Sequence, residues 1–198
     1  MSSAPARRTL DGLRPRPIRF VRRAQAAVEL NAPLTLHDAT AADATAIHTL
    51  IADHLAEGHL LPRERTEIAA HLHRFVVVRH GSVVVACAEL APLSRRVAEV
   101  RSFVVSRDVR SRGTGRRMLE ALLARARAAG FERVCAFTHS PGYFVHQGFA
   151  MVPHAWVPEK IATDCHGCRK FRNCGQYAVM RTLPRVNHAC VPLAALHG

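Results

Sequence analysis

A short run of glycines and arginines carries the clearest chemistry in this sequence. Arg110-Ser111-Arg112-Gly113-Thr114-Gly115 stands between a Val-rich segment and a strongly helical one. Glycine lets the backbone turn tightly and lets a ligand approach it closely. The first N–H groups of a helix are unpaired and the helix dipole adds partial positive charge, so such a turn binds phosphate or pyrophosphate. The expected reinforcement of this anion site comes from Arg110, Arg112, Arg116 and Arg117.

Two other phosphate-binding motifs are excluded at this loop. No Gly-Lys-Ser/Thr follows it, which rules out a Walker motif, and the third glycine of the dinucleotide fingerprint is missing. A Gly-x-Gly pair alone also fits an ordinary strand-to-helix turn. The elements around the loop therefore have to decide between an anion site and a simple turn.

The hydrophobic pattern predicts an α/β chain of the mixed α+β kind, in which a central mixed sheet is flanked by helices. Strands are expected at residues 34–36, 75–78, 83–90, 97–105, 134–137 and 177–183, with a hairpin turn at His80-Gly81. Helices are expected after the capping box of Thr40 and Asp43, over 62–72, from the glycine loop to Gly130, and from Ser140-Pro141 to Gly148.

Residues 99–119, EVRSFVVSRDVRSRGTGRRML, resemble the GNAT acetyltransferase superfamily, whose signature is Arg/Gln-x-x-Gly-x-Gly/Ala after a Val-rich strand. The signature falls on Arg110, Gly113 and Gly115. Residues 143–149, YFVHQGF, resemble the short aromatic helix that this family places later in the chain. The resemblance implies a GNAT-like sheet that is mostly antiparallel, and an N-acetyltransferase that uses acetyl-CoA as co-substrate.

The same resemblance implies how acetyl-CoA is held. The backbone of Val104 and Val105 would pair with the pantetheine arm, and the amides of the loop would hold the pyrophosphate. The implied cofactor-binding residues are Val104, Val105, Arg110, Ser111, Arg112, Gly113, Thr114, Gly115 and Arg116. Where many family members have a tyrosine that protonates the leaving thiolate, this sequence has Phe144, next to Tyr143. The thiolate would then leave unassisted or take its proton from water.

Three further stretches are similar to the short, single-domain bacterial N-acetylglutamate synthases. They are GHLLPR at 58–63, EVRS at 99–102, and the segment 158–174 with its PEK and spaced cysteines. This similarity implies L-glutamate as the acetyl acceptor, with transfer directly from acetyl-CoA in a ternary complex. The tetrahedral oxyanion would be met by a backbone N–H of the Val104–Val105 strand.

Glutamate has two carboxylates, and bidentate arginine is a natural partner for each of them. Arg63 and Arg101 are therefore the candidate substrate-binding residues, with Lys160 as the third. The attacking amine must lose a proton. Glu99 is the candidate catalytic carboxylate, acting directly or through water, although a structural ion pair with a neighbouring arginine fits this residue equally well.

Cys165, Cys168 and Cys174 follow the pattern Cys-x-x-Cys-x5-Cys. This spacing could hold zinc if His188 or Cys190 supplied a fourth ligand. A loop of reduced thiols fits the pattern as well, since no secretory signal directs the chain to a compartment where disulfides form. No metal is therefore assigned to the cysteine cluster.

The formal charge of +13 favours anionic partners. Residues 1–31 are expected to form a basic, disordered arm, although their composition also fits a transit peptide. Residues 32–184 form the expected acetyltransferase domain with a Cys-rich segment at 164–175, and 185–198 form a tail. No apolar run approaches about 18 residues, so no membrane span is expected. The predicted location is the cytoplasm, and a homodimer stays open.

Two other functions also stay open. A GNAT enzyme could acetylate another amine, such as a protein N-terminus or an antibiotic, and an acidic acceptor pocket would favour these cationic substrates. A non-catalytic module could bind nucleic acid through the basic arm and the cysteine cluster. Aromatic residues are only 6% of the chain and fall in strand and core patterns, which argues against nucleic acid. The expected partners are therefore two small molecules, acetyl-CoA and L-glutamate.

Overall fold

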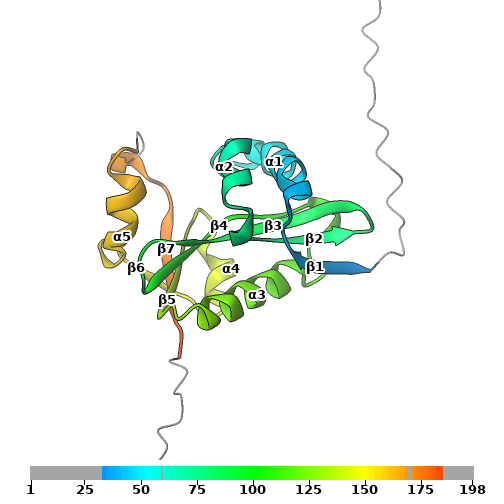
Figure 1. Ribbon diagram of the computed structural model, residues 1–198. Helices are drawn as coiled ribbons and strands as arrows, with labels where there is room; N and C mark the ends of the chain where they lie inside the picture. The colour runs from blue at the N-terminus through cyan, green and yellow to red at the C-terminus, as the bar shows by residue number, and fades with distance from the viewer. Residues whose placement is uncertain (1–32, 59, 169–170, 185–198) are drawn as a thin grey trace, which may run out of the picture.

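The computed structural model describes residues 33–184 except for 59 and 169–170. Within these residues a seven-stranded sheet runs through the centre in the order β1-β2-β3-β4-β5-β7-β6 (Figure 1). The strands are β1 Leu34–Asp38, β2 Phe75–His80, β3 Val83–Pro92, β4 Val97–Val105, β5 Arg133–Thr138, β6 Ala150–Val152 and β7 Tyr177–Thr182. Among them β4 and β5 are parallel, and the remaining neighbours are antiparallel. The predicted mixed, mostly antiparallel sheet flanked by helices is confirmed.

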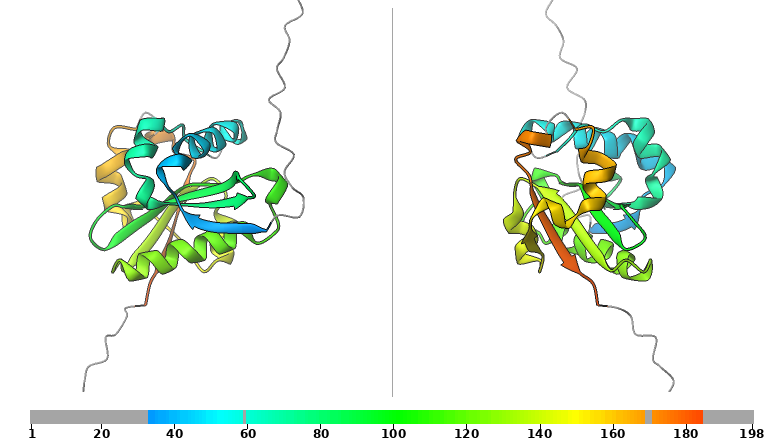
Figure 2. Two further views of the ribbon diagram at one scale, coloured as in Figure 1. Left: turned by 45° about the vertical axis from the view of Figure 1, so that its right-hand side comes forward. Right: turned by 90° about the vertical axis from the view of Figure 1, so that its left-hand side faces the viewer.

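Helices cover both faces of the sheet (Figure 2). The helices are α1 Ala44–Asp53 and α2 Arg65–Ala70 on one face, α3 Thr114–Ala128 and α4 Pro141–His146 on the other, and α5 Pro158–Lys160 near β5 and β7. Alternating residues of β2 produce the two layers, because Val76 and Val78 pack with α3 whereas Phe75 and Val77 pack with α1 and α2. Shorter turns are η1 Ala41–Asp43, η2 Leu55–Glu57, η3 Leu72–Arg74, η4 Arg107–Val109, η5 His154–Trp156, the π-helical η6 Ile161–Cys165 and η7 Phe171–Asn173.

The predicted helix start at Pro62 is wrong. The chain is still extended at Glu64, with φ −73° and ψ 138°, and α2 begins at Arg65. The cause lies in Arg63, whose side chain crosses to the sheet and bonds there, which holds this segment away from helical geometry. The sequence pattern also missed β6 and α5, because elements of three residues carry too little periodicity to be recognised.

The predicted arm at 1–31 and the predicted tail at 185–198 lie outside the described residues. Across the part of the chain that the structure describes, no helix is both long and apolar enough to cross a membrane.

β4 separates from its parallel neighbour halfway along its length. In the described sheet the pairing of β4 with β5 runs from Val97 to Glu99 and stops there. On the other side, Cys87 pairs with Val104 but Glu89 pairs with Arg101, so β4 carries one extra residue. Ser102 adopts a left-handed φ of 51° at this bulge. Because a bulge bends its strand, the far half of β4 turns away from β5 and a gap opens between them.

Candidate active site

A cavity of about 1120 Å³ lies at the gap between β4 and β5. We call the part lined by residues 103–105, 109–111 and 113–116 and by α4 the loop end. The part lined by Arg63, Glu67, Glu99, Arg101, Lys160 and Asp164 we call the charged end. Pockets for single small ligands measure roughly 300–1000 Å³, so this cavity is slightly larger than that range.

The loop end has the geometry of an anion site. Gly113, with a φ of 75°, directly precedes α3, and the Arg117 N–H bonds its carbonyl at 3.0 Å. Glycine is needed here because a left-handed φ strains residues that have a side chain. The predicted cofactor-binding residues that line the cavity are Val104, Val105, Arg110, Ser111, Gly113, Thr114, Gly115 and Arg116. Arg112 is exposed and is not among the lining residues.

Two arginine side chains at the loop, those of Arg110 and Arg116, already have carboxylate partners. Arg110 donates through Nη2 to both oxygens of Glu57, at 2.8 and 3.0 Å, and through Nε to the Val105 carbonyl at 2.9 Å. The hydrogen bond from Arg110 helps to hold the pKa of Glu57 below its ordinary value. Arg116 bonds Glu120 at 2.8 Å. The anion site therefore depends on the backbone amides at the start of α3 more than on free arginine charge.

One backbone edge of β4 faces the gap. The Ser106 N–H bonds the Val85 carbonyl at 2.8 Å, while Ala86 pairs with Val105. This pattern marks Ala86 and Val105 as a non-hydrogen-bonded pair, so the Val105 N–H and C=O point away from β3. The Arg110 side chain already donates a hydrogen bond to the Val105 carbonyl, whereas the Val105 N–H is available to a ligand in the gap. Val105 thus presents the donor that the sequence assigned to Val104 and Val105 together.

Aromatic residues close the loop end. Phe144 is buried, with ring centroids 5.3 Å from Phe149 and 5.9 Å from Phe103. Tyr143 lines the cavity and packs on Phe103 at 5.5 Å. Burial, with a contribution from Glu120, raises the pKa of Tyr143 to about 12. The phenol is therefore protonated at neutral pH and can donate a hydrogen bond, which Phe144 cannot do.

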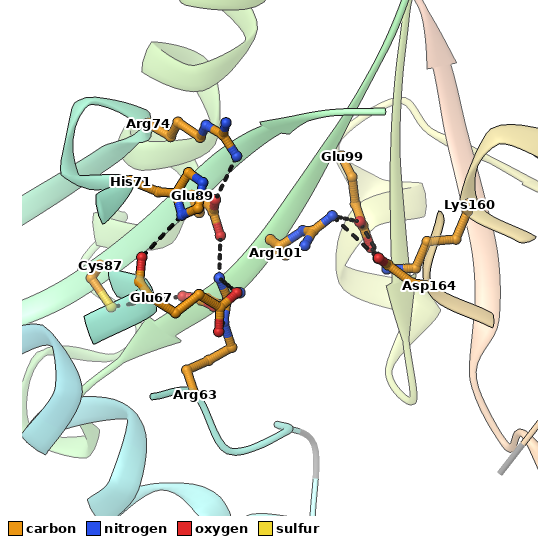
Figure 3. A network of polar contacts seen from close by, with 11 residues as sticks. Arg63, Glu67, His71, Arg74, Cys87, Glu89, Glu99, Arg101, Lys160 and Asp164 are labelled. Carbon is orange, nitrogen blue, oxygen red and sulfur yellow. Dashed lines mark hydrogen bonds and ion pairs between the residues drawn. The ribbon is translucent and has the colours of Figure 1, made fainter. Parts of the chain in front are cut away.

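The charged end is built around Glu99 (Figure 3). Its buried carboxylate meets Lys160 Nζ at 2.8 and 2.9 Å and Arg101 Nη2 at 2.9 Å. Asp164 bonds the same two cations, at 2.6 Å to Lys160 and 3.3 Å to Arg101. Burial lowers the pKa of Lys160. The carboxylates of Glu99 and Asp164 raise it by more than burial lowers it, so the pKa lies above its ordinary value and the amine is charged. Sequence reasoning missed Asp164 as a site residue, although its position four residues after Lys160 favours such a pair.

Arg63 belongs to a second ionic group at the same end (Figure 3). It bonds Glu89 at 3.0 Å, the Ser102 hydroxyl at 3.1 Å and Glu67 at 2.8 Å. Glu89 is fully buried on β3 and also lies 3.9 Å from Arg74. The structure thus brings all three predicted substrate-binding cations to the cavity. Arg63 bonds three side chains of the protein there, whereas Arg101 and Lys160 each bond the two carboxylates Glu99 and Asp164.

The cysteines of the predicted cluster also line the charged end. Cys165, Cys168 and Cys174 are free thiols there. Burial, opposed by Lys160, raises the pKa of Cys165. Among the described residues no three His, Cys, Asp or Glu side chains are placed to hold a metal ion. His188 and Cys190, the possible fourth ligands, lie outside the described residues.

Comparisons with known proteins bear on the family of this chain. Residues 43–149 match the acetyltransferase (GNAT) family. An uncharacterized N-acetyltransferase of Chlorobaculum tepidum is 30% identical over 148 residues, which are 75% of this chain and 96% of the relative. An amino-acid acetyltransferase of Ralstonia nicotianae is 34% identical over 63% of this chain, but the match spans only 27% of that relative's length.

A solved structure extends the comparison to bound ligands. It is N-acetylglutamate synthase from Neisseria gonorrhoeae complexed with coenzyme A and N-acetyl-glutamate, with a TM-score of 0.69 and 25% identity. The match covers 78% of this chain and 36% of the other.

Proposed function

Because this chain belongs to the acetyltransferase (GNAT) family, it is an acyltransferase with acetyl-CoA as co-substrate, and we propose that its acceptor is the α-amine of L-glutamate. The observation that carries the proposal is the pair of cations Arg101 and Lys160, held side by side on a buried carboxylate at the charged end. The likeness to amino-acid acetyltransferases and to a synthase bound to N-acetyl-glutamate supports the same acceptor. N-acetylglutamate would then serve arginine biosynthesis in the cytoplasm.

The loop end would take acetyl-CoA. The amides at the start of α3 would bind the pyrophosphate, and the gap-facing edge of β4 at Val105 would pair with the pantetheine arm. The acetyl group would then lie in the gap between the two ends of the cavity. The same edge would offer a backbone N–H to the oxyanion, and the thiolate would leave without a proton from Phe144.

The charged end would bind the acceptor and accept the proton that its amine loses. Arg101 and Lys160 would bind the carboxylates of glutamate, with Arg63 as a further cation at the cavity wall. A carboxylate has about four acceptor positions. The cations of the site use three of those on Glu99, which leaves one on Oε1 for the amine or for a water that carries its proton. Attack by the amine, direct transfer and release of coenzyme A complete the reaction in a ternary complex.

A screen of amino acids for release of free coenzyme A from acetyl-CoA tests the acceptor directly. We expect glutamate to support turnover, because its second carboxylate can use the second cation at the charged end. Glutamine has the same length without the charge and should be used far less well. If no amino acid caused release of coenzyme A but a peptide or an aminoglycoside did, glutamate would be contradicted as the acceptor. The transferase activity itself would still stand.

Arg101→Ala should raise the KM for glutamate by roughly 10- to 100-fold, the usual effect of losing a hydrogen bond to a charged group. The KM for acetyl-CoA should stay near its original value, since Arg101 lies at the other end of the cavity from the loop. Arg101→Lys keeps the charge but not the bidentate geometry, so it should be intermediate. Steady-state kinetics with each substrate varied would measure this, and equal effects on both KM values would remove Arg101 from the acceptor site.

A further inference from the structure

Asp164 brings a negative charge to the charged end from outside the sheet. Its side chain is 37% exposed, whereas that of Glu99, within β4, is 3% exposed. Both carboxylates bind the same two cations, Arg101 and Lys160 (Figure 3). One carboxylate is thus fixed in the core, and the other sits on the half-exposed helical turn η6.

The two cations and two carboxylates balance without any ligand. An acidic ligand would therefore meet cations that already have partners, and one of these partners would have to give way. Glu99 is enclosed and receives three contacts of 2.8 to 2.9 Å. Asp164 makes its contact with Arg101 through a single bond of 3.3 Å, so this bond is the weakest of the group.

Arg101 has hydrogen-bonding capacity that Asp164 does not use. Its Nη2 serves both carboxylates, while its buried Nε has no hydrogen-bond partner. A guanidinium recognises a carboxylate best through two parallel N–H groups. A ligand carboxylate that engaged Nε and Nη2 together would satisfy Arg101 better than Asp164 does.

We propose that Asp164 stands in for a substrate carboxylate at Arg101, and that an acidic amino acid displaces it on binding. The inference rests on the proposed function, because it assumes an acceptor with a side-chain carboxylate. Asp164 is then a specificity-determining residue. A ligand with that carboxylate replaces the contact that Arg101 loses, whereas a neutral ligand of the same length offers Arg101 nothing in exchange for Asp164 and leaves it with Glu99 alone.

Asp164→Asn tests the inference through the direction of its effect. Removal of the competing carboxylate should lower the KM for glutamate, roughly three- to tenfold. The reason is that glutamate would no longer have to displace the Asp164 carboxylate from Arg101. The KM for acetyl-CoA should not change, because Asp164 lies at the charged end of the cavity. Calorimetric binding of glutamate in the presence of coenzyme A should show the same gain without turnover.

Two variants serve as controls. Asp164→Glu keeps the carboxylate and should keep the KM close to that of the wild type. Glu159→Gln removes a negative charge from the adjoining helix α5, but Glu159 pairs with Arg133 at 3.3 Å and does not line the cavity, so the KM should stay unchanged. Thermal unfolding of each variant checks that it is folded.

A KM for glutamate that rises or stays the same in Asp164→Asn would overturn the inference and leave the proposed function intact. In that case Asp164 would only hold Lys160 in place. No turnover of glutamate by the wild-type chain would overturn both the proposed acceptor and this inference.

Discussion

Replacing Gly113 with tryptophan is expected to abolish acetyl-CoA binding while the sheet and its helices stay folded. The φ of 75° at Gly113 is strained for any residue with a side chain, by roughly 1–2 kcal/mol. This strain, together with an indole at the start of α3, would displace the amides that should receive the pyrophosphate. The Cβ itself would meet nothing within 4 Å, so the core is not disturbed. Calorimetry with acetyl-CoA measures the loss.

Gly130→Trp is the matched control. Gly130 also has a left-handed φ, 81°, and also has open space around its Cβ, but it lies past the far end of α3. A helix of 15 residues is about 22 Å long, so this site is remote from the loop. Gly130→Trp should lose similar stability and bind acetyl-CoA normally. Normal binding by Gly113→Trp as well would remove the cofactor site from this loop.

Glu99→Gln should lower kcat by roughly 100-fold or more, the usual contribution of a positioned proton acceptor. The amide keeps the shape of the carboxylate, but it loses the charge that holds Arg101 and Lys160 and that would attract the proton of the amine. The KM for acetyl-CoA should change little, because Glu99 lies at the charged end of the cavity. Single-turnover kinetics with glutamate would separate this effect on the chemical step from an effect on binding.

Glu89→Gln controls for the removal of a buried carboxylate. Glu89 is as buried as Glu99, but its partners are Arg63 and Arg74. We expect lower stability and a higher KM for glutamate, with kcat retained. If the two variants lost kcat equally, Glu99 would have only a structural role, as an ion-pair partner of Arg101 and Lys160.

The loop end could be predicted from the sequence because its information is local. Gly113, Gly115 and the Val-rich strand before them lie within about twenty consecutive residues, and the turn they specify needs no distant partner. The match to the acetyltransferase (GNAT) family confirms the family assignment and the enzyme class, and it contradicts the alternative of a non-catalytic module. The acetyl acceptor stays a prediction.

The charged end could be predicted only in part, because its contacts join residues far apart in the chain. Arg63 was recognised as a cation, but its bond to Glu89, 26 residues away, follows from the pairing of strands and not from any local pattern. Asp164 meets Arg101 across 63 residues. The sequence pattern identified which side chains are charged, whereas the fold determines which charges already have partners.

The bulge in β4 also sets which way its side chains face. Val100 packs on the α3 side of the sheet, and alternation alone would put Val104 on that side too, yet Val104 packs with α1. The extra residue at the bulge therefore reverses the face to which each later side chain of β4 points, compared with strict alternation from Val100. Since the loss of a single residue would turn every later side chain to the opposite face, deleting one residue from β4 should disrupt the fold more than replacing one.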